Sequence, residues 1–385
     1  MSAREPYSPS PTVAVIGAGV IGLAIAWRLA QRGAKVSVFD KGAAGSGASH
    51  AAAGMLAAHL EAEPREENLV TLNRASQQMW PAFAAELEAA SGMSVDMRTE
   101  GTLLLALTGD DQSRLKHVLA FQKSLGLPLE WLTATEARRR EPHLTPTISG
   151  AIFSPQDHQV DNRLVAAALR AAVLKAGVIL HENTPVERTL TSDTRVTGVV
   201  AGGKTVPADI VVLAAGAWSR GIAGLPAASL PPVRPVKGQM LALRMDPQAP
   251  LLTHVVWAPG AYLVPRKDGR LLIGATVEEN GFDPHLTAGG QLALLEATWR
   301  ALPGIEELPI HEQWVGFRPG SRDDAPIIGE SSLPGLVYAT GHYRNGILLT
   351  PITADAVASL VMEGKADPRA GNFSFARFAQ PVAAE

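Results

Sequence analysis

The feature that most limits how this chain can fold is a glycine-rich segment between a predicted strand and a predicted helix. The apolar, β-branched run 12–17 leads into Gly17, Gly19 and Gly22, and an Ala/Leu-rich helical pattern covers residues 20–32. A tight turn, a close backbone approach to a pyrophosphate and close helix–strand packing require glycine at this spacing. Since the N–H groups and dipole at a helix N-terminus favour negative charge, the segment predicts a diphosphate site.

An acidic residue at the end of the next strand strengthens this prediction. Gly33 ends the helix, residues 35–40 form a second β-rich run, and the βαβ unit fills about 30 residues, as a parallel crossover requires. Asp40 closes the run, where a carboxylate accepts hydrogen bonds from an adenosine ribose. The glycine spacing alone also occurs in ordinary turns, whereas strand, helix and acid together predict dinucleotide binding. They do not separate FAD from NAD.

Composition excludes several classes of protein. The 34 basic and 37 acidic side chains leave a formal charge of -3, which excludes a polybasic nucleic-acid or membrane-surface binder as the leading hypothesis. Cysteine is absent, which removes disulfides, thiolate metal sites and cysteine-tethered cofactors; the histidines lack metal-ligand spacing, so no metal is expected. The apolar stretch 13–30 contains glycines and Arg28 and is too short for a membrane span, so we expect a soluble, cytoplasmic protein.

Periodicity along the 385 residues predicts an α/β fold in two domains, each built from separated pieces of chain. Apolar and β-branched runs predict strands at 101–107, 178–181, 196–200, 209–213, 234–244, 262–266, 270–276, 313–318 and 336–340, and helical patterns cover 111–125, 162–176, 287–301 and 347–362. We assign residues 1–75, 151–233 and 324–385 to a Rossmann-like dinucleotide-binding domain. Residues 76–150 and 234–323 are assigned to a β-rich α+β substrate domain with an antiparallel sheet.

Three further features suit contact with a large planar ligand. Residues 45–49 and 51–56 are rich in small and hydroxyl side chains, as in a loop that lies flat against such a ligand, although flexible surface loops share this composition. Residues 211–219 read as a buried strand whose end faces a cofactor, or as ordinary core. In 341–349 a glycine-flanked polar turn opens the last helix, and its unpaired N–H groups suit the electron-rich edge of a reduced cofactor.

Together these segments resemble the FAD-dependent D-amino-acid-oxidase superfamily, and within it most closely the glycine oxidases of thiamine biosynthesis. The resemblance extends from Val13 to about Met362. The segments that carry it are GAGVIGLAIAWRLA, ASHAAAGMLAAHLEAE, RPVKGQMLAL, YLVPRKDGRLLIGATVEENGF, GFRPGSRDDAPIIG and GHYRNGILLTP. It implies a D-amino-acid-oxidase type of fold, with the antiparallel sheet of the substrate domain covering the flavin of a non-covalent FAD.

The resemblance also implies a set of FAD contacts that extends beyond the glycine-rich segment. These contacts include the small-residue loop, a backbone contact at residue 186, the strand end at 215–216 and the turn 342–348. The residues so implied are Gly17, Gly19, Val20, Ile21, Gly22, Asp40, Lys41, Ala48, Ser49, Ala53, Gly54, Met55, Val186, Ala215, Gly216, His342, Tyr343, Asn345, Gly346, Ile347 and Leu348.

For the substrate, the resemblance implies Arg318, Arg344 and Tyr262. A guanidinium offers a planar fork to a carboxylate, and a tyrosine hydroxyl donates a further hydrogen bond. Arg344 could instead be a surface residue, although an arginine at a helix start opposes the dipole and so needs a reason. The alternative for Arg318 is a salt bridge to Asp323 or Asp324. No acid/base catalytic residue is predicted, because hydride loss from an unprotonated amine gives the imine directly.

Two positions depart from the family pattern. Where the glycine oxidases carry a histidine two residues before the pocket tyrosine and a methionine shortly after it, this chain has Gly260 and Val277. Both changes shorten the side chain, which predicts a roomier pocket and leaves glycine, sarcosine and small D-amino acids open as substrates. Asp40 replaces the commoner glutamate, and it should still reach the ribose.

The resemblance therefore implies an FAD-dependent amine oxidoreductase that oxidises glycine, sarcosine or small D-amino acids. Hydride transfer to flavin N5 would yield the imine and then glyoxylate, while oxygen would be reduced to hydrogen peroxide. A thiazole synthase would take over the imine in thiamine synthesis, and a homo-oligomer is expected. Two alternatives stay open: a D-amino-acid dehydrogenase that passes electrons to a quinone or carrier, and a flavin-binding electron-transfer module without an amino-acid site.

Overall fold

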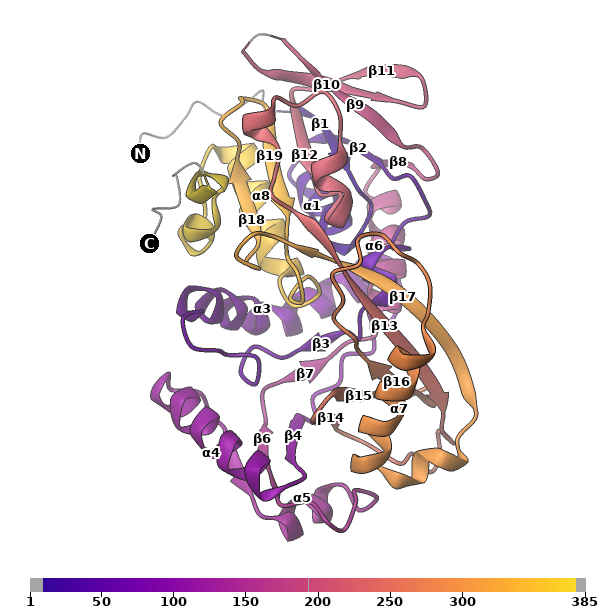
Figure 1. Ribbon diagram of the computed structural model, residues 1–385. Helices are drawn as coiled ribbons and strands as arrows, with labels where there is room; N and C mark the ends of the chain where they lie inside the picture. Colours follow the sequence, from indigo (N-terminus) through magenta and orange to yellow (C-terminus); the bar gives the residue numbers. More distant parts are fainter. Residues whose placement is uncertain (1–9, 193, 379–385) are drawn as a thin grey trace.

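The glycine-rich segment follows the first strand of a six-stranded sheet in the upper part of the molecule (Figure 1). The computed structural model describes residues 10–192 and 194–378. β18 is antiparallel to β19 and the other described neighbours pair in parallel, which confirms the predicted Rossmann-like topology. The strand order is β18 (Ile327–Glu330), β19 (Leu336–Thr340), β12 (Ile210–Leu213), β1 (Thr12–Ile16), β2 (Lys35–Phe39) and β8 (Ile179–His181).

Two separate cores cover the two faces of this sheet. In β1, Val13 and Val15 belong to one core while Ala14 and Ile16 belong to the other, as alternation along a strand requires. The first core is shared with the helices α1 (Val20–Gln31), α3 (Glu67–Ser91), α6 (Asn162–Lys175) and α8 (Thr350–Glu363). The second core is shared with a three-stranded antiparallel sheet, β9 (Val186–Thr191), β10 (Val196–Ala201) and β11 (Lys204–Pro207).

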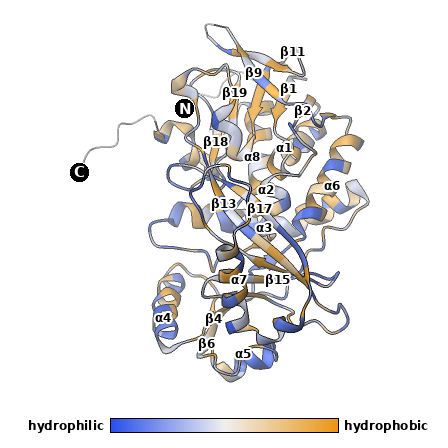
Figure 2. Ribbon diagram, turned by 45° about the vertical axis from the view of Figure 1, so that its right-hand side comes forward, coloured by the Kyte–Doolittle hydropathy of each residue, from blue (hydrophilic) through white to orange (hydrophobic). Residues whose placement is uncertain are grey.

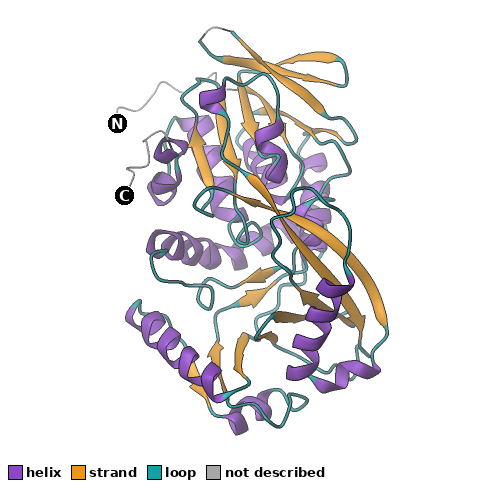
Figure 3. Ribbon diagram, in the orientation of Figure 1, coloured by secondary structure: helices purple, strands orange, loops and turns teal. Residues whose placement is uncertain are grey.

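The second large sheet has eight strands and is mostly antiparallel, as the sequence predicts (Figure 3). β14 and β4 pair in parallel, and the other described pairs are antiparallel. The strand order is β17 (Ile310–Gly320), β13 (Arg234–Arg244), β16 (Arg270–Gly274), β15 (Ala261–Pro265), β14 (Val255–Ala258), β4 (Thr102–Ala106), β6 (Gly150–Ser154) and β5 (Glu130–Leu132). The helices of this part are α4 (Gly109–Ser124), α5 (Ala134–Arg140) and α7 (Ala288–Ala301).

The remaining elements of the described chain are short. They are α2 (Ala48–Ala51), the two-stranded pair β3 (Met55–Leu56) and β7 (His158–Gln159), and the 3-10 helices η1 (Gly216–Gly221), η2 (Ala227–Ser229), η3 (Pro303–Glu307), η4 (Pro368–Phe373) and η5 (Phe375–Phe378). Hydropathy follows this arrangement, with hydrophobic residues along β1 and hydrophilic residues on the outer helix α5 (Figure 2). In the described parts of the chain, every helix is too short or too polar to cross a bilayer.

One long helix is absent from the sequence predictions. α3 extends over 25 residues with Pro81 inside it, and its buried side chains include Trp80, Phe83 and Leu87. A proline within a helix removes a backbone hydrogen bond, and burial of these side chains compensates for that loss. Residues 82–91 are rich in alanine, leucine and glutamate, which favour a helix, so the sequence carries a signal that the predictions missed.

This helix bears on the division into domains. The predicted boundary at 75/76 falls inside α3. Its buried residues Trp80, Phe83 and Leu87 pack in the core of the Rossmann-like sheet, whereas Val70 packs in a separate core with Ala106 and Leu115. The predicted boundary at 150/151 falls at the first residue of β6, which belongs to the antiparallel sheet. The chain instead passes between the two sheets after Val95 and again before Val160, since both of these residues lie in the first core.

Candidate functional site

A cavity of about 730 Å³ lies between the two large sheets and is lined by both. It extends from the carboxyl ends of β1 and β2 to β13, β15 and β17. Of the residues predicted to contact cofactor or substrate, all line this cavity except Gly22. The fold thus brings together segments that are far apart in the sequence, and the roles of the individual residues stay predictions.

Gly22 lies where its spacing predicts a packing role. A Cβ atom here would lie 1.9 Å from the carbonyl oxygen of Gly17, so a larger residue would push α1 away from β1. Gly17 has a φ of +106°, and a Cβ atom on it would lie 2.4 Å from the carbonyl oxygen of Ala214. The absence of a side chain at both glycines therefore lets the N-terminus of α1 lie at the edge of the cavity.

Two polar side chains organise the same end of the cavity. Asp40 accepts the N–H of Ala18 at 2.7 Å on Oδ2 and the N–H of Gly42 at 2.9 Å on Oδ1. Each carboxylate oxygen keeps a lone pair for a ribose hydroxyl. The Oγ of Ser49 accepts the N–H of Val20 at 3.0 Å, so its own hydroxyl hydrogen can point toward a diphosphate.

The turn before α8 presents backbone donors to the cavity. Among the described residues, the N–H groups of Gly346, Ile347 and Leu348 have no hydrogen-bond acceptor, and all three residues line the cavity. The Nε2 of buried His342 lies 3.1 Å from the Oγ1 of Thr353, and burial lowers its pKa to about 3, so the ring is neutral at neutral pH. Free N–H donors suit a ring edge that gains negative charge on reduction.

A buried arginine outside the predicted set supports the wall of the cavity. Arg266 is 3 % exposed, and burial lowers its pKa to about 10, so it still carries its charge. Its Nη1 donates to the Oε1 of Gln159 and to the carbonyl oxygen of Val160, both at 2.8 Å. Its Nη2 donates to the carbonyl oxygen of Ala53 at 2.8 Å and to the Oδ1 of Asn162 at 3.0 Å. Arg266 thereby holds the backbone of the predicted flavin loop.

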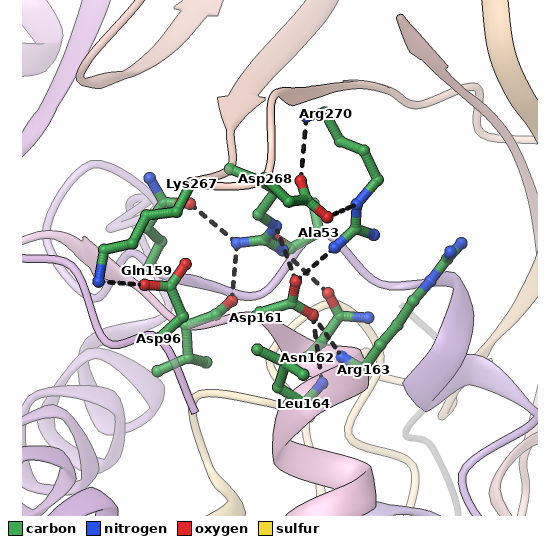
Figure 4. A network of polar contacts seen from close by, with 12 residues as sticks. Ala53, Asp96, Gln159, Asp161, Asn162, Arg163, Leu164, Lys267, Asp268 and Arg270 are labelled. Carbon is green, nitrogen blue, oxygen red and sulfur yellow. Dashed lines mark hydrogen bonds and ion pairs between the residues drawn. The ribbon is translucent and has the colours of Figure 1, made fainter. Parts of the chain in front are cut away.

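The surrounding ion pairs extend this network to α6 (Figure 4). Asp161 caps α6 by accepting the N–H of Arg163 at 2.9 Å, and its Oδ2 accepts from Arg270 at 2.7 Å. Arg270 also pairs with Asp268 at 2.6 Å. The sequence analysis did not predict this network, because charged residues at the end of a strand are usually expected to be exposed to solvent.

Arg318 and Tyr262 lie together at the opposite end of the cavity. The Nη1 of Arg318 donates to the carbonyl oxygen of Thr276 at 3.1 Å, and the hydroxyl of Tyr262 donates to the Sδ of Met240 at 3.2 Å. Burial raises the pKa of Tyr262, and the nearby charge of Arg318 opposes that rise. Val277 also lines the cavity, whereas Gly260 does not.

The alternative salt bridge for Arg318 is not formed. Asp323 pairs with Arg377 at 2.8 Å and Asp324 pairs with Arg234 at 3.2 Å. Across residues 10–192 and 194–378, no carboxylate lies within ion-pair distance of Arg318. Its guanidinium is therefore available to an external carboxylate.

Arg344, which the resemblance assigns to the substrate carboxylate, already pairs with carboxylates of this chain. Its Nε lies 3.3 Å from the Oε2 of Glu61, its Nη1 lies 3.5 Å from Glu63, and its Nη2 lies 3.1 Å from Glu66. Each guanidinium nitrogen thus faces a carboxylate of this chain, although Arg344 still lines the cavity. These ion pairs are the reason for an arginine at this helix start.

Glu61 is the functional candidate that the sequence analysis missed. It lines the cavity, 11 % of its side-chain surface is exposed, and the Nδ2 of Asn345 donates to its Oε2 at 3.3 Å. Burial raises the pKa of Glu61 to about 7, and Arg344 opposes this rise. The position of Glu61 soon after the small-residue loop could have indicated a place in the site. It was missed because a run of acidic residues is typical of a solvent-exposed surface.

An aromatic stack forms another wall of the cavity. The Nζ of Lys41 lies 3.5 Å from the ring centroid of Trp218, and Phe282 stacks on that ring with centroids 5.0 Å apart. Phe317 meets Trp218 edge-on at 6.1 Å. Partial burial lowers the pKa of Lys41, and Asp40 opposes this shift. The stack joins the end of β2 to β17.

Comparisons with known proteins agree with this geometry. A glycine oxidase of Geobacillus kaustophilus is 41 % identical over 352 residues, which is 91 % of this chain and 92 % of that protein. The crystal structure of glycine oxidase from the same organism covers 95 % of this chain and 98 % of that chain, with a TM-score of 0.87 and 39 % identity.

A second type of relative is longer than this chain. A bifunctional protein ThiO/ThiG of Trichormus variabilis is 38 % identical over 369 residues, which is 95 % of this chain but 55 % of that protein. This chain therefore spans about half the length of the bifunctional relative. The profile of the family described as FAD dependent oxidoreductase (DAO) matches residues 12–360. The chain belongs to the FAD-dependent oxidoreductase (DAO) family.

Proposed function

We propose that this protein oxidises the amine of glycine or another small α-amino acid. The observation that carries the proposal is the position of Arg318, an arginine without a carboxylate partner among the described residues, beside Tyr262 in the cavity of an FAD-dependent oxidoreductase. A carboxylate bound there would receive charge-assisted hydrogen bonds worth roughly 1.5–3 kcal/mol each.

The residues of this chain would orient the substrate and exclude water. Arg318 and Tyr262 would fix the carboxylate and so limit the orientations of the Cα–H bond, while the N–H donors of the turn 346–348 would face the ring edge that gains negative charge. FAD supplies the chemistry of accepting a hydride and of passing two electrons to oxygen. The released imine hydrolyses to glyoxylate and ammonia, and oxygen yields hydrogen peroxide.

The relatives support this substrate class. Glycine oxidase is the name of a relative that this chain matches over nine-tenths of both lengths, whereas the two alternative functions of the sequence analysis receive no such support. Val277 lines the cavity, and its side chain is shorter than the methionine of the family pattern, so sarcosine and small D-amino acids stay within the proposal.

We further propose that the imine is handed to a thiazole synthase in thiamine synthesis. The support is the match to half of a bifunctional ThiO/ThiG protein, whose name pairs two functions in one polypeptide. A homo-oligomer and a cytoplasmic location stay predictions. Thiazole formation from glycine in a coupled reaction with a purified synthase, and its loss when this protein is omitted, would test the hand-over.

The experiment that tests the main proposal is reduction of the yellow holoprotein without oxygen. Glycine, sarcosine and D-alanine are added in turn, and bleaching of the flavin band is expected with at least one of them. Admitting air should restore the colour and form one hydrogen peroxide per amine oxidised. A bleached protein that air does not reoxidise would indicate the dehydrogenase, and a spectrum that no amine changes would exclude an amino-acid site.

A further inference from the structure

A carboxylate lies inside the same cavity as the proposed carboxylate clamp. Glu61 lines the cavity together with Arg318 and Tyr262. The pKa of Tyr262 is lowered by the charge of Arg318 and raised by that of Glu61, so both charges act on this phenol. The cavity therefore holds a positive group, Arg318, and a negative group, Glu61, that both act on Tyr262. A zwitterionic substrate requires one group of each sign.

The backbone that carries Glu61 is held by buried polar side chains. Asp157, which is 0 % exposed, accepts the N–H of His59 at 3.0 Å and the N–H of Leu60 at 2.8 Å. Gln122, also 0 % exposed, donates through Nε2 to the carbonyl oxygens of His59 at 3.1 Å and Leu60 at 3.2 Å. Buried polar groups that pair on both sides of a segment specify one position for it.

The side chain of Glu61 is held through one oxygen. Arg344 and Asn345 both approach Oε2 at 3.3 Å. Within the described residues, neither the Oε1 of Glu61 nor the buried Oδ1 of Asn345 has a hydrogen-bond donor. Asn345 is 3 % exposed and lines the cavity. Acceptors without donors on two side chains that are hydrogen-bonded to each other suit an ammonium group, which has three donors and no acceptor.

We propose that Glu61 binds the ammonium group of the substrate and takes one proton from it before the Cα–H bond breaks. The inference rests on the proposed oxidation of an amino acid. The N–H bond breaks, its proton moves to Oε1 of Glu61, and its electron pair stays on nitrogen. That pair forms the C=N bond as the hydride leaves Cα with two electrons for FAD. The proton then passes from Glu61 to solvent. Arg344 is a positioning residue that orients Glu61.

The ionisation of Glu61 is compatible with this role. Burial raises its pKa to about 7, which brings it closer to the pKa of an amine. The charged groups that act on it are Arg344, which lowers its pKa, and Asp157, Glu63 and Glu66, which raise it. The carboxylate form predominates above this pKa, so the reaction should slow as the pH falls below it.

The test compares Glu61→Gln with Glu296→Gln. Glu296 lies in α7, is exposed and does not line the cavity. In anaerobic stopped-flow reduction by glycine near neutral pH, Glu61→Gln should be slower than the native protein by about 100-fold, and Glu296→Gln should be unchanged. At a pH of about 10, where solvent supplies the unprotonated amine, Glu61→Gln should regain most of its rate. A structural role alone predicts no such recovery.

Ligand binding provides a second measurement that needs no turnover. Acetate keeps the carboxylate and lacks the ammonium, and its binding is followed by the shift of the flavin spectrum. Glu61→Gln should bind acetate at least as tightly as the native protein does, because acetate has no ammonium group for Glu61 to bind. A native protein that glycine, sarcosine and D-alanine all fail to reduce overturns the proposed function. A native protein that is reduced, with Glu61→Gln equal to it near neutral pH, overturns the role of Glu61 alone.

Discussion

The Nη2 of Arg266 donates to the carbonyl oxygen of Ala53 at 2.8 Å, which ties the antiparallel sheet to the predicted flavin loop. A Cβ atom on the next residue, Gly54, would lie 2.9 Å from this same nitrogen and 2.0 Å from the carbonyl oxygen of Val160. The loop backbone is thus packed directly against a buried guanidinium. Its position depends on a residue that is distant in the sequence.

We expect Arg266→Met to lower both stability and flavin affinity. The change leaves the acceptors on Gln159, Val160, Ala53 and Asn162 without their donor, and each buried orphan acceptor costs about 1–3 kcal/mol. Urea unfolding of the holoprotein should therefore show a loss of at least about 3 kcal/mol, with earlier release of the flavin. The control is Lys267→Met, since the side chain of Lys267 is 69 % exposed. Equal losses in both variants would contradict the assigned role.

Arg318→Ala should weaken substrate binding and leave a yellow holoprotein. Loss of a bidentate guanidinium–carboxylate contact should raise the substrate concentration needed for half-maximal reduction by about 100-fold or more. Stopped-flow reduction over a glycine series measures it. Arg322→Ala, which removes an exposed arginine close by in the sequence, is the matched control. Colourless Arg318→Ala protein would instead assign Arg318 to the cofactor.

Gly238→Ala tests the position of the same guanidinium without removing it. A Cβ atom at Gly238 would lie 2.5 Å from the Nη1 of Arg318, the far end of a flexible side chain, so the guanidinium must move. Misplacement of this kind should lower the second-order rate of reduction by about 10- to 100-fold while the melting temperature changes little. Gly289→Ala, whose added methyl would meet no atom within 4 Å, should leave the rate unchanged.

Arg344→Ala should shift the pH dependence of reduction. Arg344 lowers the pKa of Glu61 and of Glu66, so its removal should raise both pKa values further. The acid side of the pH–rate profile should therefore move to higher pH than in the native protein. Rates of anaerobic reduction measured across a pH series at saturating glycine check this. A profile that keeps its midpoint would show that Glu61 does not govern it.

Glu61→Gln should increase stability at alkaline pH. The folded-state pKa of Glu61 is raised from 4.5 to about 7, so the folded protein binds this proton more tightly than the unfolded chain does. The resulting stabilisation is present at acid pH and is lost as the pH rises through both values. Urea unfolding gives the free energy of unfolding of Glu61→Gln minus that of the native protein. This difference should be about 3 kcal/mol larger above the higher pKa than at acid pH. Parallel stability curves for the two proteins would contradict this.

Local features of the fold were predictable because they depend on residues close together in the chain. Gly17, Gly22 and Asp40 act within one βαβ unit, and both the parallel pairing of β1 with β2 and the start of α1 agree with the prediction. Short-range periodicity likewise predicted β13 with its observed bounds. α3 was not predicted, although residues 82–91 are rich in helix-forming alanine, leucine and glutamate. Pro81 interrupts the pattern, and burial in the assembled core compensates for the hydrogen bond that the proline removes.

The sequence by itself determined the dinucleotide-binding unit and the mixed α/β class, since glycine conformation and hydrophobic period act over a few residues. The other segments that line the cavity were expected from the resemblance to a family and not from local pattern. Tertiary structure alone decided that Arg344 faces Glu61 rather than solvent, and that Arg266 holds Ala53. An ion pair or a buried hydrogen bond depends on the distance between two groups and on their removal from water. Neither quantity exists until segments far apart in the chain are packed together.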